Sequence, residues 1–142
     1  SRGFFLLLLI LPLSFNHGFP KPSIKMVLQE EYPSGVNVTI LCEGPENNLT
    51  FFLHKSMDLR ASQETEPGSN RARFLVQIIN LEDAGNYTCQ YHKSGNPFVW
   101  SVPSNPAQLV VRGEEFHLDC FIVQSFRVGR TILNIFFSTD TF

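Results

Sequence analysis

The stretch Asp83-Ala84-Gly85-Asn86-Tyr87-Thr88-Cys89 decides the fold of this chain of 142 residues. Asp and Gly near its start suit a tight turn. Tyr87 and Cys89 then fall on one face of a strand, because alternate strand residues point to the same side. A tyrosine two residues before a strand cysteine is typical of a tyrosine corner, in which the hydroxyl bonds back to the upstream backbone. The stretch therefore predicts a turn that leads into a strand with an inward cysteine.

A second strand supplies a partner for that cysteine. Residues 36–42 alternate apolar and more polar side chains, which is the two-residue period of a half-buried strand, and Cys42 takes an inward position. Cys42 and Cys89 are 47 residues apart. A disulfide that closes so long a loop stabilises a domain by about 4 kcal/mol on the chain-entropy view. We predict a Cys42–Cys89 disulfide in the core.

Short strands without a helical period characterise the whole middle of the chain. Residues 57–70 are polar and lack any period, which predicts an edge region or a loop. The predicted strands cover residues 36–42, 50–55, 74–79, 86–92 and 108–111. Strands at intervals of about ten residues predict an all-β, immunoglobulin-like C2-type sandwich of two antiparallel sheets over residues 19–112. The tryptophan expected in the core of such a sandwich is absent, and Leu53 takes its place.

Several motifs of this domain resemble those of one receptor family. They are Lys21-Pro22-Ser23-Ile24, Asn37 to Cys42, Phe51 to Lys55 and Trp100-Ser101-Val102-Pro103-Ser104. The stretch resembles the domains of the leukocyte receptor complex, which include killer-cell and leukocyte Ig-like receptors, collagen-binding receptors and the T-cell-interacting activating receptor on myeloid cells. In that family leucine normally replaces the strand tryptophan, as Leu53 does here. The resemblance implies an immune receptor ectodomain that binds a protein ligand.

The first 18 residues predict a secretory signal peptide. Arg2 precedes an apolar run of about ten residues, whereas a membrane span needs about 20. Cleavage is expected after Gly18, with Ser14 as the other candidate. A buried segment of the mature fold is the alternative, which Pro12 disfavours. An exported chain would be extracellular, either secreted or at the cell surface in a longer, anchored form, and its cysteines would meet oxidising conditions.

Residues 113–142 predict an atypical tail from a truncated or alternative end. The uncharged run 131–139 is too short to span a membrane. The alternative is a fragment of a second domain, because Gly113 to Cys120 repeats the spacing of Gly35 to Cys42. Against this alternative, the first strand of a second domain is missing and no further cysteine follows Cys120 in the sequence. We expect a Phe-rich tail of this kind to be poorly ordered or prone to aggregation.

The sequons and the net charge indicate which modifications and which partners to expect. Asn37, Asn48 and Asn86 each begin an Asn-x-Thr triplet and are predicted glycosylation sites. The net charge of −2 and the isoelectric point near 6.0 disfavour nucleic acid as a partner.

The sequence lacks the residue patterns that are typical of an active site. The histidines His54, His92 and His117 lack the spacing of metal ligands, and a catalytic triad would need a chance assembly of scattered residues. We predict neither enzymatic activity nor a metal or cofactor.

The predicted function is therefore binding of a protein ligand. The resemblance points to a collagen-like or MHC class I-like ligand and, through collagen-binding relatives, to contacts at Arg60, Glu64, Tyr91 and Trp100. Two simpler interpretations are that Trp100 is a packing clamp and that Arg60 and Glu64 are solvated charges. The alternative function is a structural or adhesive module that associates with itself or with another immunoglobulin domain.

Overall fold

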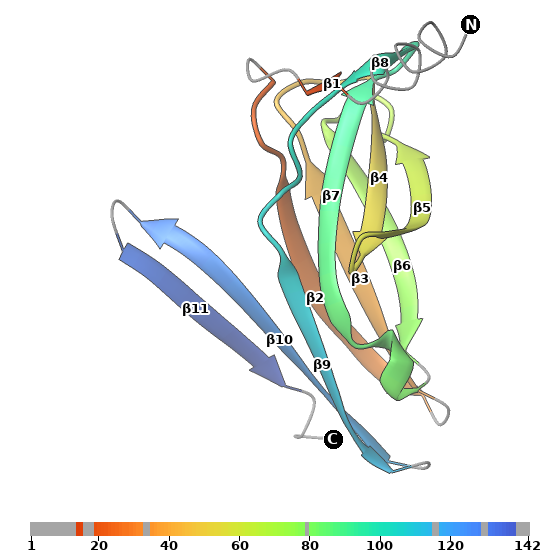
Figure 1. Cartoon of the computed structure of the whole chain (residues 1–142). Helices are drawn as coiled ribbons and strands as arrows, with labels where there is room; N and C mark the ends of the chain where they lie inside the picture. The colour runs from red at the N-terminus through yellow and green to blue at the C-terminus, as the bar shows by residue number, and fades with distance from the viewer. Residues whose placement is uncertain are drawn as a thin grey trace, which may run out of the picture.

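The chain folds as a sandwich of two β-sheets (Figure 1). This computed structural model describes residues 14–15, 19–32, 35–78, 80–114, 117–128 and 131–138. The smaller sheet has the order β2 (Ser23–Tyr32), β3 (Gly35–Glu43) and β6 (Arg71–Ile78). The larger sheet comprises β1 (Ser14–Phe15), β4 (Leu49–Lys55), β5 (Asp58–Glu64), β7 (Gly85–Lys93), β8 (Asn96–Trp100), β9 (Ala107–Glu114), β10 (His117–Val128) and β11 (Thr131–Ser138). The predicted all-β sandwich is confirmed.

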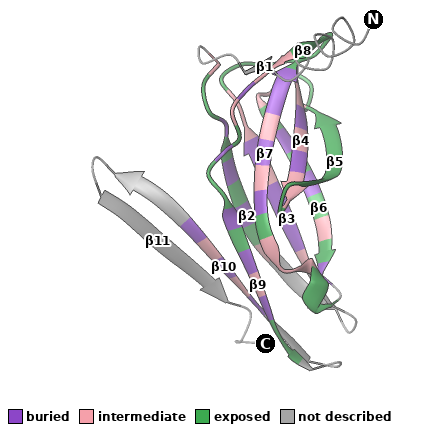
Figure 2. Cartoon of the chain, viewed as in Figure 1, coloured by how far each residue is buried: buried purple, intermediate pink, exposed green. Residues whose placement is uncertain are grey.

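The alternation of side chains builds the core between the sheets. Along β6, Ala72, Phe74 and Ile78 are buried while their neighbours are exposed (Figure 2). The strand predicted over residues 74–79 is present as β6, which begins earlier, at Arg71, and has Ile78 as its last described residue. Ile79 itself lies outside the described residues. Apolar burial of this kind is the main favourable term in folding.

A disulfide joins the two sheets through this core. Cys42 on β3 and Cys89 on β7 are bonded, with their Cα atoms 6.1 Å apart. Leu53 lies opposite Cys89 in the register of β4 and β7 and is only 1% exposed. The predicted disulfide and the predicted substitution of leucine for tryptophan are both confirmed.

The tyrosine corner is present at the entry to β7. The hydroxyl of Tyr87 donates a hydrogen bond of 2.7 Å to the backbone oxygen of Asp83. Asp83 ends a short 3-10 turn, Leu81–Asp83, whose first residues are held by the side chain of Asn80. Burial raises the pKa of the Tyr87 hydroxyl above its usual value, and the nearby Asp83 carboxylate adds to the effect.

The polar region 57–70 contains an edge strand. Every residue of β5 is exposed, so Figure 2 draws the whole strand in green. Its pairing with β4 shifts by one residue between Leu53 and His54, which leaves Arg60 as the extra residue of a bulge. The predicted edge region is confirmed, and the bulge decides where its side chains lie.

The tail adds two strands to the larger sheet. β10 pairs with β9, and β11 pairs with β10 (Figure 1). Cys120, Ile122 and Gln124 are buried, and the Gln124 amide donates to the backbone oxygen of Ile24 on β2. The prediction of a poorly ordered tail is wrong for these strands, because the free edge of β9 provides backbone partners and alternate residues of β10 face the core.

The ends of the predicted domains remain predictions. Residues 1–13 and 16–18, most of the predicted signal peptide, lie outside the described residues. Within the described ranges, no helix is long and apolar enough to cross a membrane.

Candidate functional site

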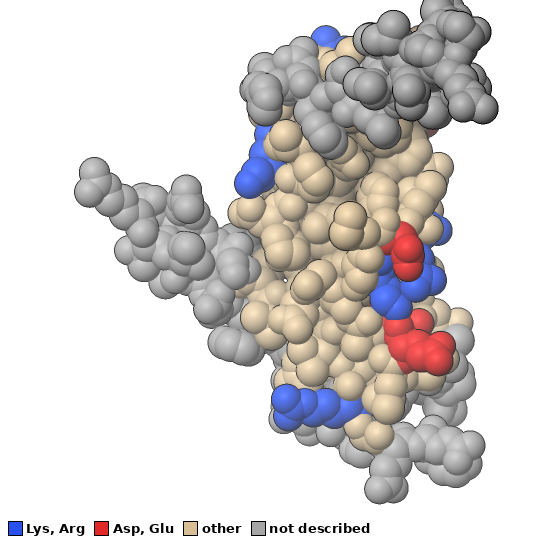
Figure 3. Space-filling model, viewed as in Figure 1, with Lys and Arg blue, Asp and Glu red and all other residues tan. Residues whose placement is uncertain are grey.

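The outer face of β4 and β7 forms an uncharged surface on the larger sheet. The outward side chains are Thr50, Phe52 and His54 on β4 and Asn86, Thr88, Gln90 and His92 on β7. Figure 3 shows that the centre of this face lacks lysine, arginine, aspartate and glutamate, which gather toward its rims. Charged residues are depleted at the centre of protein interfaces, so a face of this composition is suited to contact with a partner.

Three rings form an aromatic cluster on this surface: Phe52, His92 and Trp100. The centroid of Phe52 lies 4.4 Å from that of Trp100 and 5.3 Å from that of His92. His92 and Trp100 meet edge to face at 5.0 Å. The indole Nε1 of Trp100 donates to the backbone oxygen of Pro97 at 2.7 Å, and the side chain remains half-buried. Trp100 therefore packs on the sheet and still presents part of its ring to the outside.

Two buried serines after Trp100 hold the connection 101–104 against β7. The backbone N–H of Tyr91 donates to Ser101 Oγ at 3.0 Å, and that of Cys89 donates to Ser104 Oγ at 2.9 Å. The backbone N–H groups of the same serines donate back to the oxygens of Tyr91 and Cys89, each at 2.8 Å. Each serine hydroxyl thus takes the place of one backbone carbonyl as the acceptor for a β7 N–H group, while the serine N–H makes a normal backbone hydrogen bond, which explains why the motif needs hydroxyls at these positions.

The structure corrects the prediction for Tyr91. Its side chain is 2% exposed and points into the sandwich, 5.5 Å from the Phe51 ring and 6.1 Å from the Phe19 ring. Its hydroxyl donates to the backbone oxygen of Pro20 at 2.7 Å, and burial raises its pKa. Tyr91 is two residues from Cys89, so strand alternation turns both inward. The ring belongs to the core, and only its edge borders a small hollow beside Pro20 and Lys93, away from the outer face that carries Trp100.

Glu64 and Trp100 lie on one row of the sheet. Glu64 pairs with Thr50, Thr50 pairs with His92, and His92 pairs with Trp100. Paired residues of neighbouring strands face the same side, so this cross-strand row spans about 14 Å at the usual strand spacing. The row is the part of the predicted site that the fold brings together.

Arg60 lies elsewhere. As the bulge residue of β5 it lines a separate hollow of about 360 Å³ together with Phe74, Asp83 and Tyr87. This hollow lies between β5 and β6, away from the aromatic cluster. Arg60 is therefore separated from Glu64 and Trp100. Alternation along an unbroken strand would have placed Arg60 and Glu64 on the same face.

The predicted sequons occupy different surfaces. Asn86 is exposed on the outer face of the larger sheet, and Asn48 is exposed in a turn with a positive φ of 58°. Asn37 is half-buried on β3 in the smaller sheet. Glycosylation at all three remains a prediction.

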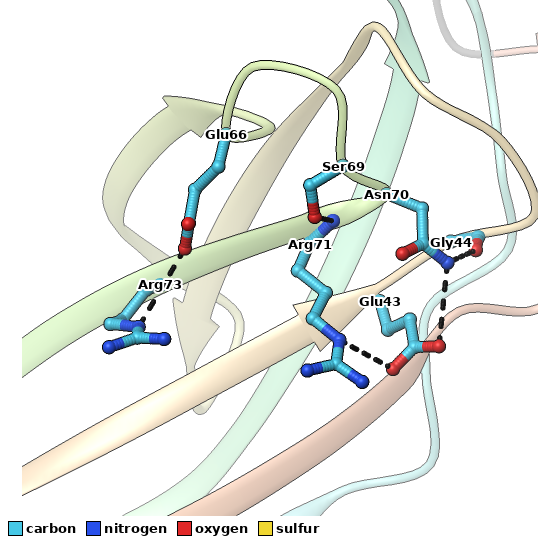
Figure 4. Close-up of polar contacts among 7 residues, drawn as sticks. All are labelled: Glu43, Gly44, Glu66, Ser69, Asn70, Arg71 and Arg73. Atoms are coloured by element: carbon cyan, nitrogen blue, oxygen red, sulfur yellow. Dashed lines mark hydrogen bonds and ion pairs between the residues drawn. The ribbon is translucent and has the colours of Figure 1, made fainter.

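The smaller sheet carries a charged cluster instead. Arg71 Nε lies 3.3 Å from Glu43 Oε2, and Arg73 Nε lies 3.7 Å from Glu66 Oε1 (Figure 4). The Asn70 amide donates to the backbone oxygen of Gly44 at 2.8 Å. These side chains are about half exposed, and such ion pairs contribute roughly 0–1 kcal/mol each. The cluster is a solvated surface.

Among the described residues, no group of three or more His, Cys, Asp or Glu side chains is placed to hold a metal ion. Burial lowers the pKa of His54, so its ring is uncharged at neutral pH. His92 directs Nδ1 at the backbone oxygen of Lys93, 2.8 Å away. The side chain of His117 is not among those that the structure describes.

A two-sheet sandwich with a core disulfide and a tyrosine corner defines a domain of the immunoglobulin type. The immunoglobulin domain family model matches residues 21–111, and the chain belongs to that family. Human "Immunoglobulin superfamily member 1" is 34% identical over 104 residues, which cover 71% of this chain and 8% of that protein. Mouse "Platelet glycoprotein VI" is 33% identical over 95 residues, which cover 67% of this chain and 30% of that protein.

A solved structure is also similar to this chain. The crystal structure of CHIR-AB1 aligns with a TM-score of 0.56 at 32% identity, over 64% of this chain and 97% of that chain. The domain is also homologous to domains of leukocyte immunoglobulin-like receptors. The chain spans only a minor part of the length of the curated relatives it matches.

Proposed function

We propose that this chain is the ligand-binding ectodomain of a leukocyte immune-regulatory receptor, secreted or held at the cell surface in a longer form. The cross-strand row from Glu64 to Trp100, with Phe52 beside it, is the observation that carries the proposal. It combines a half-exposed tryptophan with polar side chains on a face whose centre is uncharged and whose rim carries Glu64. Its kinship with the T-cell-interacting activating receptor on myeloid cells stays a prediction.

A rod-like collagen-type ligand suits this row. Aromatic rings stack on proline rings, and the exposed Glu64 and half-buried Thr50 offer hydrogen-bonding groups on neighbouring strands, while the buried His92 supports the Trp100 ring. A face without charge at its centre matches a ligand that presents prolines and backbone carbonyls. The resemblance to collagen-binding relatives and to receptors of MHC class I-like ligands supplies the two ligand classes to compare.

Binding to immobilised triple-helical peptides tests the proposal. Trp100→Ala should weaken binding about 30-fold, because truncation of a central tryptophan anchor costs about 2 kcal/mol or more. Arg73→Ala on the smaller sheet is the matched control and should leave the affinity unchanged. If Trp100→Ala lowers the melting temperature and leaves the affinity per folded molecule unchanged, Trp100 stabilises the fold as a packing clamp and does not contact the ligand.

The ligand classes separate in the same assay. Peptides of identical composition that do not form a triple helix should fail to bind. An MHC class I-type protein should not compete with the immobilised triple-helical peptides, and competition would instead identify that protein class as the ligand. Self-association that rises with protein concentration and is lost on mutation of the row, without binding to either ligand, would favour the adhesive alternative.

A further inference from the structure

A second feature of the uncharged face is a hollow of about 450 Å³ at the opposite end of β7 from the aromatic cluster. His54 and Gln90 form part of its lining, and Met57 stands at the turn between β4 and β5. Pro103 and Pro106, from the connection to β9, line it as well. Asn86 and Thr88, the first and last residues of a sequon, complete it.

The lining of this hollow suits a sugar ring. Two proline rings and Met57, which is 93% exposed, offer apolar surface for the C–H face of a pyranose. Gln90 donates through Nε2 to the Ser101 oxygen, which leaves its Oε1 free to accept a hydrogen bond from a sugar hydroxyl. Among the residues that the structure describes, no charged side chain lines the hollow. An uncharged sugar would therefore meet neither a buried charge nor a purely apolar wall.

We propose that Asn86 carries an N-linked glycan and that its first N-acetylglucosamine lies in this hollow, against Met57, Pro103 and Pro106. The occupant is thus part of the chain's own covalent structure. Asn86 is exposed and lines the hollow, so the linkage holds the sugar at its site. Tethering gives the sugar a high effective concentration there, which a free saccharide lacks.

The covalent step is a glycosyl transfer from a lipid-pyrophosphate-linked oligosaccharide. The side-chain amide nitrogen of Asn86 forms a bond to C1 of the sugar, the bond from C1 to the pyrophosphate oxygen breaks, and the amide loses one proton. In the folded chain the Asn86 backbone oxygen accepts from Ser56 N at 2.8 Å, and Asn86 pairs with Gln108 on β9. Transfer therefore occurs before β7 enters the sheet, and the sugar settles into the hollow as the sheet forms.

The glycan and the ligand row then occupy different halves of one face. Asn86 and His92 are six residues apart on β7, which is about 20 Å at the rise of a strand. The glycan covers the exposed Met57 and the two prolines and leaves the aromatic cluster open. This inference does not depend on the proposed ligand, because it concerns the chain's own modification.

The test uses full-length chain secreted from mammalian cells with high-mannose glycans. Glycopeptide mapping should find Asn86 occupied. An endoglycosidase then trims each glycan to its first N-acetylglucosamine, and the trimmed wild type is compared with trimmed Asn86→Gln. We expect the wild type to melt about 3 °C higher, since one packed sugar is a small contribution to a domain of this size. Thr88→Val, which keeps Asn86 and removes the sequon, is the second unglycosylated variant if Asn86→Gln does not fold.

A coupling experiment shows whether the sugar contacts the hollow. Met57→Ala should remove half or more of the gap in melting temperature between glycosylated and unglycosylated chains. The matched control is Leu75→Ala, a 70% exposed apolar residue on the smaller sheet, which should leave that gap unchanged. An unoccupied Asn86, an occupied Asn86 without a gap, or a gap that ignores Met57→Ala would each overturn the proposal. Loss of collagen-type binding alone would leave it standing.

Discussion

The two outer faces of this sandwich share one core and differ in chemistry. The smaller sheet presents ion pairs and exposed charges on β3 and β6 (Figure 4). The larger sheet presents an aromatic cluster and uncharged polar groups on β4 and β7. Figure 3 shows that charged side chains are absent from the centre of this face. Both faces use the same strand alternation, in which the inward residues make the fold and the outward residues are free to vary. This difference is the reason that we assign the proposed ligand contacts to the outward positions of the larger sheet.

Breaking the shared core should have the largest effect. Replacing Cys42 and Cys89 by alanine should lower the free energy of unfolding by about 2–5 kcal/mol, because the unfolded chain regains the entropy of a long loop. Denaturant unfolding measures the change. Both faces should lose their structure together, and a variant of unaltered stability would show that the disulfide is not what holds the sheets together.

The next effect should fall on the larger sheet alone. Ser104→Ala removes the acceptor for the buried N–H of Cys89, and an unsatisfied buried donor costs about 1–3 kcal/mol. The connection from Trp100 should loosen, which the fluorescence of the single tryptophan of the chain reports directly. Ser69→Ala, at a hydrogen bond near the charged cluster, is the control and should leave the emission unchanged.

A smaller effect should follow from loss of the tyrosine corner. Tyr87→Phe removes the hydrogen bond to Asp83 O and should cost about 0.5–1.5 kcal/mol. The pKa of Tyr87 is raised in the folded chain from a usual value of 10.0, so the folded state holds its proton more tightly. Stability from this group is complete below pH 10 and falls as the pH rises toward the raised pKa.

The pH profile separates this contribution from a purely structural one. Above pH 10 the wild type should lose stability more steeply than Tyr87→Phe, as measured by urea unfolding at several pH values. Tyr91, whose pKa is also raised, remains in both chains and so cancels in the comparison. Parallel profiles would show that Tyr87 ionises equally in the folded and unfolded chains.

The smallest effect should come from the charged face. Arg71→Ala breaks the pair with Glu43, and both side chains are about half exposed, so we expect a loss of roughly 0–1 kcal/mol that shrinks further in salt. Ligand binding should not change. A large loss of binding by this variant, measured on the same immobilised peptides, would move the functional face to the smaller sheet.

Local patterns in the sequence sufficed for the frame of the molecule. The period of two along residues 36–42 and 86–92, the spacing of Tyr87 to Cys89 and the polar character of residues 57–70 predicted the sheets, the disulfide and the edge strand. These features depend on neighbours within one strand, so they can be read from the chain itself.

Only the tertiary structure decided the site. The register across four strands brings Glu64 to Trp100, and the bulge at Arg60 turns that side chain away from them. The free edge of β9 draws β10 into the sheet. Tyr91 is different, because its inward direction follows from alternation with Cys89 along one strand and could have been predicted from the sequence. Register, bulges and edge pairing depend on contacts between segments far apart in the chain, and a single strand's pattern carries no record of them.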